Sequence, residues 1–547
     1  MKRLWYTLAA AILLVFAGLL WMKRAAFMDA LSAFGQKPDT TQPHVAWTPA
    51  PDLPSGAGAP GSDRLRHIIG QLLQPNAIAY EAILKFDTDE AFNDFLKNKG
   101  RLKLLANIPS LRSVRVGYDN VDDLRDIPDG SDVSANYLVQ LPAAPDPQGP
   151  GIQASAVPFG SGALSWLGIG DNETWGVGQK IAIIDTGVVE HPTLNTEHVS
   201  NSQDFVEVDG TTGTEINGHG TAVASVAAGT HAAAPGVAPA AQVLSFRVAD
   251  SDGNSDSFTL AQGILAAAEA GADVINISLG STGDSGVVEE AVNKAMAAGS
   301  TIVAAAGNNG ADSLSYPAAY EGVISVGSVD AAGQHLDFSN TAESLNISAP
   351  GYAVPAAWPG EQVIQFTGTS ASAPFVSGAI AAVMSWDPSL TGQQSYDLLV
   401  YHANEAGAPG TDAIYGEGIL NVGRVVNAET SGIHDAAVAS HYYAGDLGNN
   451  GREILQIVVE NRGTELLLGS TLAVDSPVGK QQFNLGPIQP GGVVTREVVV
   501  DTRLAELQGQ IDYRTNLTFA GNVVDDNPLN NQLSSSFLPP SAAETSE

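Results

Sequence analysis

The stretch "KIAIIDTG" at residues 180–187 contains an apolar run that ends in Asp, Thr and Gly. Four similar runs follow: "AQVLSFRV" (241–248), "ADVINISLG" (272–280), "STIVAAAGN" (300–308) and "GVISVGSV" (322–329). Runs of this kind are typical of strands that are buried on both faces of a parallel sheet. Helical stretches are predicted at 256–270, 285–298 and 370–385. We therefore predict a doubly wound α/β domain with a mainly parallel sheet over residues 160–430.

A second, smaller domain is predicted before it, over residues 64–142. Its expected strands are 77–86, 102–108, 111–118 and 135–142, and its expected helices are 88–100 and 119–127. The resulting order, βαββαβ, is typical of a ferredoxin-like α+β fold. The Pro/Gly-rich residues 143–159 then predict a linker.

Residues 431–538 have a different texture, with short alternating runs such as "EILQIVVENRG" (453–463) and "QIDYRTNLTF" (510–519) separated by turn signals. This pattern predicts an all-β sandwich. Residues 539–547 form a Ser/Pro tail.

The N-terminus has an apolar run from Leu4 to Met22, which is long enough to span a bilayer as a helix. Lys2 and Arg3 precede it and favour an orientation that leaves the rest of the chain outside the cytoplasm. We interpret residues 1–27 as a membrane anchor, with a cleaved signal peptide as the alternative, and residues 28–63 as a Pro/Gly-rich tether. The protein is accordingly expected to be membrane-anchored or secreted, as in bacteria.

The net charge of −34 is unevenly distributed. Residues 60–118 carry a net charge of +3, whereas residues 119–547 carry −39. This acidity argues against nucleic acid as a partner, because phosphate binding needs clustered Lys and Arg. The chain has no cysteine, so disulfides and thiolate catalysis are excluded.

Three polar residues stand where elements of the predicted sheet domain begin or end. Asp185 ends the first strand, His219 lies between glycines before a helix, and Ser370 begins another helix. Each could instead have a structural role: Asp185 as a turn residue, His219 as a buried histidine and Ser370 as a helix cap. Together they offer a hydroxyl, an imidazole to take its proton, and a carboxylate to orient the imidazole.

The motifs around these residues resemble those of the subtilisin-like serine peptidases. They are "DTG" (185–187), "NGHGT" (217–221), "SLG" (278–280), "AAAGNNG" (304–310) and "GTSASAP" (368–374). The order of these residues along the chain, Asp then His then Ser, is the order found in that family. The resemblance implies that Ser370 is the nucleophile, His219 the general base and Asp185 its orienting partner. It further implies that Asn308 donates to the oxyanion, and that Ser278, Leu279 and Gly280 pair with an extended substrate.

The resemblance extends to the flanking domains. Residues 64–142 are similar to the inhibitory propeptides of the family, and the sandwich to CARDB-type bacterial adhesion modules. We thus expect an exported endopeptidase made as a zymogen that cleaves itself within 142–160. Its partners would be polypeptide substrates, its own propeptide and, through the N-terminal segment, a membrane. The alternative is an adhesion or scaffolding protein with an inactive peptidase-like domain.

No cofactor is expected with certainty. Many relatives have a calcium loop after the helix that begins at His219, but here the span "GTHAAAP" (229–235) lacks oxygen-rich side chains. We interpret the segment "DSDGNSDS" (250–257) as a solvated loop, with calcium binding as the alternative.

Overall fold

The computed structural model describes residues 62–142, 152–153, 155–170, 172–206, 217–446, 452–477, 479–501, 510–521 and 523–537. The apolar run 4–22, most of the tether, the start of the linker at 143 and the tail lie outside these ranges. Within them, none of the helices is long and apolar enough to cross a membrane.

A seven-stranded sheet forms the centre of the α/β domain, in the order β15-β14-β13-β12-β6-β10-β7. All of its neighbouring strands pair in parallel. The strands are β6 (Lys180–Asp185), β7 (Val199–Asp204), β10 (Gln242–Arg247), β12 (Val274–Ile277), β13 (Thr301–Ala305), β14 (Ile324–Val329) and β15 (Ile347–Pro350). The predicted parallel sheet is therefore confirmed.

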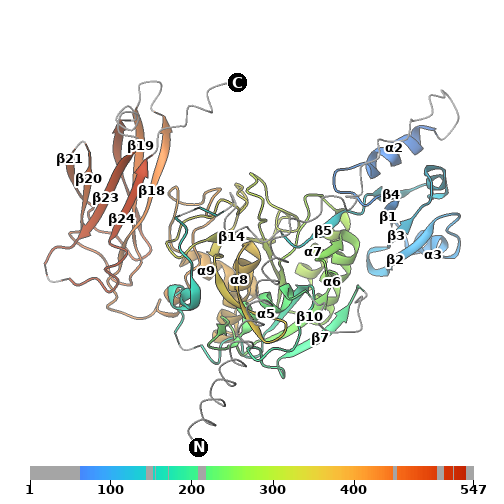
Figure 1. The fold of residues 1–547 in the computed structure, drawn as a ribbon, viewed down its shortest axis with the longest axis horizontal. Coiled ribbons are helices and arrows are strands. Elements are labelled where there is room, and N and C mark those ends of the chain that lie inside the picture. Colours follow the sequence, from blue (N-terminus) through green and yellow to red (C-terminus); the bar gives the residue numbers. More distant parts are fainter. Residues whose placement is uncertain are drawn as a thin grey trace, which may run out of the picture. The chain divides into compact units, whose positions relative to one another are not determined.

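Helices cover both faces of this sheet (Figure 1). Ile181 and Ile183 of β6 pack with α5 and α8, whereas Ala182 and Ile184 pack with α6 and α7. The alternation follows from the two-residue period of a strand. The helices are α4 (Ala163–Trp166), α5 (His219–Ala228), α6 (Ser257–Glu269), α7 (Gly286–Ala297), α8 (Thr369–Trp386), α9 (Gly392–Tyr401) and α10 (Val422–Val426).

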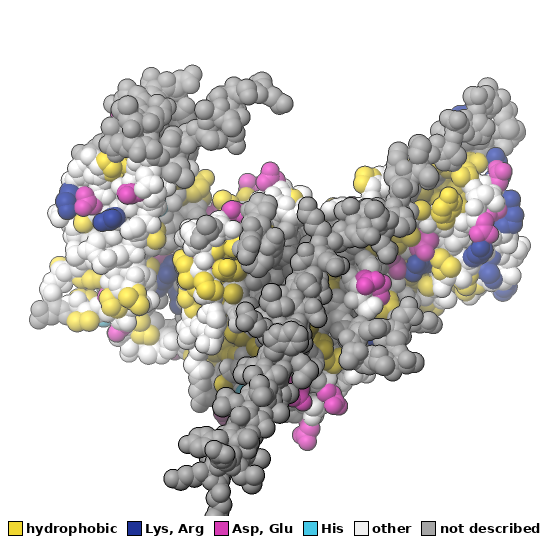
Figure 2. All heavy atoms as spheres, in the orientation of Figure 1, with side chains coloured by type: hydrophobic (Ala, Val, Ile, Leu, Met, Phe, Trp, Pro, Cys, Tyr) yellow, Lys and Arg dark blue, Asp and Glu magenta, His cyan; other side chains and the backbone are white. Residues whose placement is uncertain are grey.

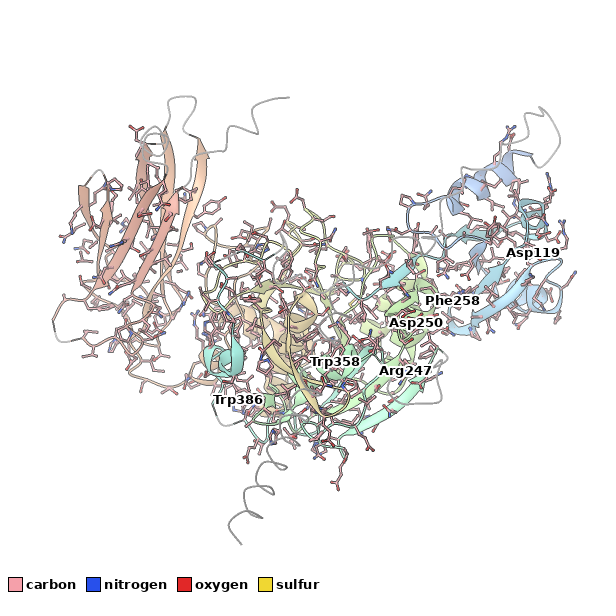
Figure 3. All side chains as sticks on the ribbon, in the orientation of Figure 1. Asp119, Arg247, Asp250, Phe258, Trp358 and Trp386 are labelled. Atoms are coloured by element: carbon pink, nitrogen blue, oxygen red, sulfur yellow. The ribbon has the colours of Figure 1, made fainter. Side chains whose placement is uncertain are left out.

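Short strands pair at the margins of the domain. They are β8 (Thr230–His231) with β9 (Ala234–Pro235), β16 (Val354–Trp358) with β17 (Gln362–Phe366), and β11 (Asn254–Asp256), whose partner β5 lies outside the α/β domain. Figure 3 marks Trp358, at the end of β16.

The N-terminal domain has a four-stranded antiparallel sheet in the order β2-β3-β1-β4. Its elements are α2 (Ser62–Leu72), β1 (Glu81–Phe86), α3 (Asp89–Lys97), β2 (Lys103–Ile108), η1 (Pro109–Leu111), β3 (Ser113–Gly117), η2 (Val121–Asp126) and β4 (Ser131–Ser134). Three details differ from the sequence prediction. Helix α2 was not expected, the second helix is a 3-10 helix, and the fourth strand is 131–134.

The expected closing strand at 135–142 leaves this sheet. Its central residues form β5 (Leu138–Gln140), which pairs with β11 of the α/β domain. The pairing partner is remote in sequence, so the apolar run itself carried no information about which sheet it joins.

The N-terminal domain packs against the α6 and α7 side of the α/β domain. Ile83, Leu111 and Val139 share a hydrophobic core with these helices. Ion pairs flank this apolar contact: Lys85 with Glu290 at 2.7 Å and Arg115 with Asp256 at 2.7 Å. In both pairs the cation belongs to the N-terminal domain, where Lys and Arg side chains gather in Figure 2.

The described strands between residues 436 and 537 form two packed antiparallel sheets, β18-β19-β22 and β21-β20-β23-β24. The strands are β18 (Ala436–Asp446), β19 (Arg452–Asn461), β20 (Thr471–Ser476), β21 (Gly479–Asn484), β22 (Val493–Asp501), β23 (Ile511–Thr518) and β24 (Gln532–Phe537). Leu455, Leu472 and Tyr513 are buried between the sheets. This arrangement fits the predicted sandwich.

Candidate active site

Asp185 and His219 meet at the carboxyl edge of the sheet. Asp185 is the last residue of β6 and is fully buried, and His219 is the first residue of α5. The imidazole Nδ1 lies 2.9 Å from Oδ1 and 3.0 Å from Oδ2 of the carboxylate. Because a carboxylate can only accept, Nδ1 carries the proton, and Nε2 is left as the basic nitrogen.

Thr186 also holds the Asp185 carboxylate in place. Its main-chain N–H donates to Asp185 Oδ1 at 2.8 Å, and its hydroxyl accepts from the N–H of Gly220 at 3.0 Å. Gly220 follows His219 and has no room for a side chain, since an added Cβ would lie 2.5 Å from the Gly187 carbonyl oxygen. The close approach of β6 and α5 therefore depends on a glycine at this position.

Ser370 lies in the first turn of α8, with only 2% of its surface exposed. Gly368 precedes the helix with φ of 131°, a conformation that favours glycine. The Ser370 hydroxyl donates to the main-chain carbonyl of Ser278 at 3.0 Å rather than to the imidazole.

Asn308 follows β13, and its carboxamide oxygen is tied to Thr369. Oδ1 accepts the main-chain N–H of Thr369 at 2.9 Å and its hydroxyl at 2.8 Å. The amide nitrogen is on the side of Gly368, where an added Cβ would lie 2.7 Å from it. The two bonds to Thr369 thus decide which end of the carboxamide is the donor next to the Ser370 helix.

The segment Ser278-Leu279-Gly280 continues from β12, and a segment of the N-terminal domain lies against it. Gln140 and Gly280 exchange two main-chain hydrogen bonds of 2.9 Å. On the opposite edge, β5 pairs with β11, and the N–H of Leu141 donates to the Gly253 carbonyl at 2.9 Å. Residues 138–141 therefore lie as an extended strand between two stretches of the α/β domain.

Comparison with known proteins identifies the family of this chain. Residues 176–418 match the subtilase family. Subtilisin BL from Lederbergia lenta is 36% identical over 270 residues, covering 49% of this chain and 98% of that protein. This chain belongs to the subtilase family. A thermostable alkaline protease from Halalkalibacterium halodurans is 35% identical over 273 residues, covering 50% of this chain and 74% of that protein.

A solved structure, the epidermin leader peptide processing serine protease from Staphylococcus aureus, has the same fold as the subtilase. Its TM-score is 0.54 at 24% identity, and the match covers 64% of this chain and 99% of that one. By family the subtilase is a serine endopeptidase.

The sequence predicted Asp185, His219, Asn308 and Ser370 as site residues, but it did not predict the residues that contact them. Thr186 directly follows Asp185 in "DTG", and Thr369 directly precedes Ser370 in "GTS". This adjacency was the signal in the sequence that could have indicated their role. Phe366 packs edge-on against the His219 ring, with 5.2 Å between ring centroids. Nothing local in the sequence indicates this contact, because the two residues lie on different elements.

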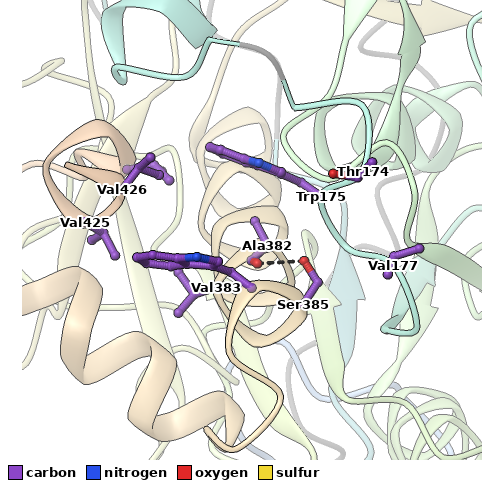
Figure 4. A pocket seen from close by; sticks show the side chains of 10 residues that line it. Thr174, Trp175, Val177, Ala382, Val383, Ser385, Val425 and Val426 are labelled. Atoms are coloured by element: carbon purple, nitrogen blue, oxygen red, sulfur yellow. Dashed lines mark hydrogen bonds between the residues drawn. The ribbon is translucent and has the colours of Figure 1, made fainter. Parts of the chain in front are cut away.

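The subtilase also has a cavity of about 310 Å³ at the C-terminal end of α8 (Figure 4). Trp175, Ser385 and Trp386 are among its lining residues. Ser370 is near the other end of the same helix, about 24 Å away at 1.5 Å per residue. This cavity is therefore not the catalytic cleft.

Two loops of the α/β domain, 229–235 and 250–257, bear on metal binding. Within the ranges described above, no group of three or more His, Asp or Glu side chains is placed to hold a metal ion. In the segment 250–257, Asp250 Oδ1 accepts the N–H groups of Asp252 and Asn254 at 3.0 and 2.8 Å. The lack of a calcium site at 229–235 stays a prediction.

Proposed function

We propose that the subtilase cleaves polypeptides by Asp-His-Ser catalysis and is made as a zymogen that processes itself. The observation that carries this proposal is the pairing of Gln140 with Gly280, two residues from the carbonyl that holds the Ser370 hydroxyl. The chain's own segment lies where an extended substrate would lie.

The proposed reaction uses four side chains. Ser370 Oγ attacks the scissile carbonyl carbon while His219 Nε2 takes the hydroxyl proton, and Asp185 stabilises the resulting imidazolium. The tetrahedral oxyanion accepts hydrogen bonds from the Asn308 amide and from the main-chain N–H of Ser370. That N–H lies in the first turn of α8, where amides have no partner within the helix.

Collapse of the tetrahedral intermediate breaks the C–N bond. His219 returns the proton to the leaving amine, and an acyl-enzyme ester remains on Ser370. Water then attacks the ester with His219 again as the base, which releases the carboxylic acid and restores the hydroxyl. The buried Asp185 carboxylate keeps the imidazole in the required tautomer throughout.

The strand register supports one specific bond as the processing site. Gln140 faces Gly280 in an antiparallel pair, so two further residues bring Pro142 opposite Ser278. Ser278 is the residue whose carbonyl accepts the Ser370 hydroxyl. We therefore propose that the Pro142–Ala143 bond is cut. The prediction from sequence was the wider span 142–160, much of which lies outside the described residues.

The test compares the full-length chain with Ser370→Ala, using Ser389→Ala as a control on an exposed serine. We expect the wild type and the control to be processed, with Ala143 as the new N-terminus, and to react with a serine-directed fluorophosphonate. Ser370→Ala should do neither. Processing that persists in purified Ser370→Ala would exclude self-cleavage, and absence of labelling in processed wild type would exclude Ser370 as nucleophile.

Export is the second part of the proposal. It is supported by the apolar run from Leu4 to Met22 and the basic residues before it. If the run is an anchor, the cut at Pro142 separates the catalytic domain from it. Cell fractionation should then find the cut-off catalytic domain outside the cell and the Ser370→Ala chain in the membrane fraction. Finding both variants in the cytoplasm would contradict export.

A further inference from the structure

Gly283 lies beside the extended segment that pairs with Gly280, and it leaves space for an aromatic ring. A Cβ added to Gly283 would lie 2.2 Å from Cδ1 and 2.4 Å from Cγ of Tyr137. Gly283 is not among the glycines with positive φ, so its backbone does not demand glycine. What the missing side chain provides is room for the ring.

Tyr137 is held there as part of an extended backbone. Its N–H donates to Ser257 Oγ at 3.1 Å, and its carbonyl accepts the N–H of Ser257 at 2.9 Å. These bonds continue the pairing of β5 with β11. Because they involve only the main chain of Tyr137, any extended polypeptide can form them.

The tyrosine ring is partly desolvated at this position. Burial raises the pKa of the Tyr137 hydroxyl, and the Asp284 carboxylate raises it further. Asp284 is the residue after Gly283, and its Oδ1 accepts a hydrogen bond from the Tyr320 hydroxyl at 3.2 Å. The Tyr137 ring packs directly against the backbone of Gly283.

We propose that Gly283 determines specificity by accepting an aromatic side chain six residues before the scissile bond of a substrate. The inference rests on the proposed function, because the position is counted back from Pro142. Tyr137 fills the site before processing, and substrates fill it after the N-terminal domain has left. An aromatic ring buries a large apolar area, which favours it over small side chains.

The test uses peptide anilides with the sequence of residues 137–142, Tyr-Leu-Val-Gln-Leu-Pro, with a matched peptide that begins with Ala, and with the tetrapeptide Val-Gln-Leu-Pro. Processed wild-type enzyme should cleave the Tyr peptide with a kcat/KM about tenfold above that of the Ala peptide, a difference of about 1.4 kcal/mol. Gly283→Ala should reduce this ratio to about one, because its methyl group occupies the place of the ring.

Two features of the design separate the possible causes. The variants carry Tyr137→Ala, so that the added methyl does not meet Tyr137 during maturation. Gly286→Ala is the matched control, because a Cβ there meets nothing within 4 Å, and it should keep the tenfold preference. Equal cleavage of both hexapeptides by wild type, or a preference that survives Gly283→Ala, would overturn the inference. Failure of wild type to cleave the tetrapeptide would overturn the proposed function itself.

Discussion

The hydroxyl of Ser370 donates a hydrogen bond to the main-chain carbonyl of Ser278 at 3.0 Å. In the antiparallel register set by Gln140 and Gly280, the residue opposite Ser278 is Pro142. Proline has no N–H to donate, so the Ser278 carbonyl is open to the Ser370 hydroxyl. The Ser370 hydroxyl therefore donates its proton to this carbonyl and not to the His219 imidazole.

We expect Pro142→Ala to process itself faster than wild type. The new N–H competes for the Ser278 carbonyl and releases the Ser370 hydroxyl toward His219. A neutral hydrogen bond contributes about 1 kcal/mol, so the rate should rise roughly fivefold. The rate of self-processing can be measured by refolding the purified chains, quenching samples at successive times and following cleavage on gels. Pro158→Ala, at a position outside residues 138–142, is the control. An unchanged rate in Pro142→Ala would contradict this account.

Thr369 orients Asn308, and its removal should impair turnover rather than binding. Thr369→Val loses the hydroxyl that donates to Asn308 Oδ1 at 2.8 Å, whereas Thr369→Ser keeps it. Deleting an oxyanion donor costs about 10²–10³ in kcat, a figure measured in this same family, and misorienting one should cost less, about tenfold. Steady-state kinetics should show a lower kcat with a nearly unchanged KM for Thr369→Val, whereas Thr369→Ser should retain the kcat of wild type. A loss confined to KM would refute the assignment.

Arg115 should keep the N-terminal domain bound after cleavage. Its guanidinium donates to both carboxylate oxygens of Glu81 at 2.8 Å and to Asp256 at 2.7 Å across the domain boundary. Truncating one partner of such a pair costs about 2–5 kcal/mol. Arg115→Ala should therefore shorten the lag between cleavage and full activity by roughly 30-fold or more. Lys103→Ala, whose partner Asp119 is in the same domain, should keep the normal lag.

Glu460 should be essential for the junction between the α/β domain and the sandwich. It lies on β19 with 2% exposure and pairs with Arg424 of α10 and, at 2.9 Å, with Arg462. Breaking a buried ion pair on one side typically costs about 3–5 kcal/mol of unfolding free energy. Denaturant unfolding of Glu460→Gln should show this loss. Asp475→Asn, from an exposed pair with Lys480, should change stability by less than about 1 kcal/mol.

Glu405 at the same junction should make stability fall as pH rises. Burial raises the pKa of its carboxyl to about 7, and the Glu460 carboxylate adds to the shift. Between the ordinary carboxyl pKa and about 7, the unfolded chain loses the proton while the folded chain keeps it. The contribution of Glu405 to the free energy of unfolding is therefore fully present below the ordinary carboxyl pKa, and it is lost as pH rises through about 7. Melting temperatures should show less loss from pH 5 to pH 8 in Glu405→Gln, and equal loss would contradict the assignment.

The helices and sheet of the α/β domain follow closely from sequence pattern. The helices expected at 256–270, 285–298 and 370–385 are observed as Ser257–Glu269, Gly286–Ala297 and Thr369–Trp386. The apolar runs became parallel strands because residues buried on both faces, such as Ile181 and Ala182, can pack only in a covered sheet. The placement of Asp185, His219 and Ser370 at element ends was visible for the same reason.

Other features depend on contacts that exist only in the folded chain. Residues 135–142 have the composition of a strand, but whether β5 joins its own sheet or lies beside Gly280 depends on contacts between residues far apart in sequence. The same holds for Thr369 beside Asn308 and Phe366 beside His219. Sequence by itself determined which side chains could do chemistry, because periodicity and end position are local. The tertiary structure decided which segment lies beside Gly280, since strand pairing and side-chain orientation are non-local.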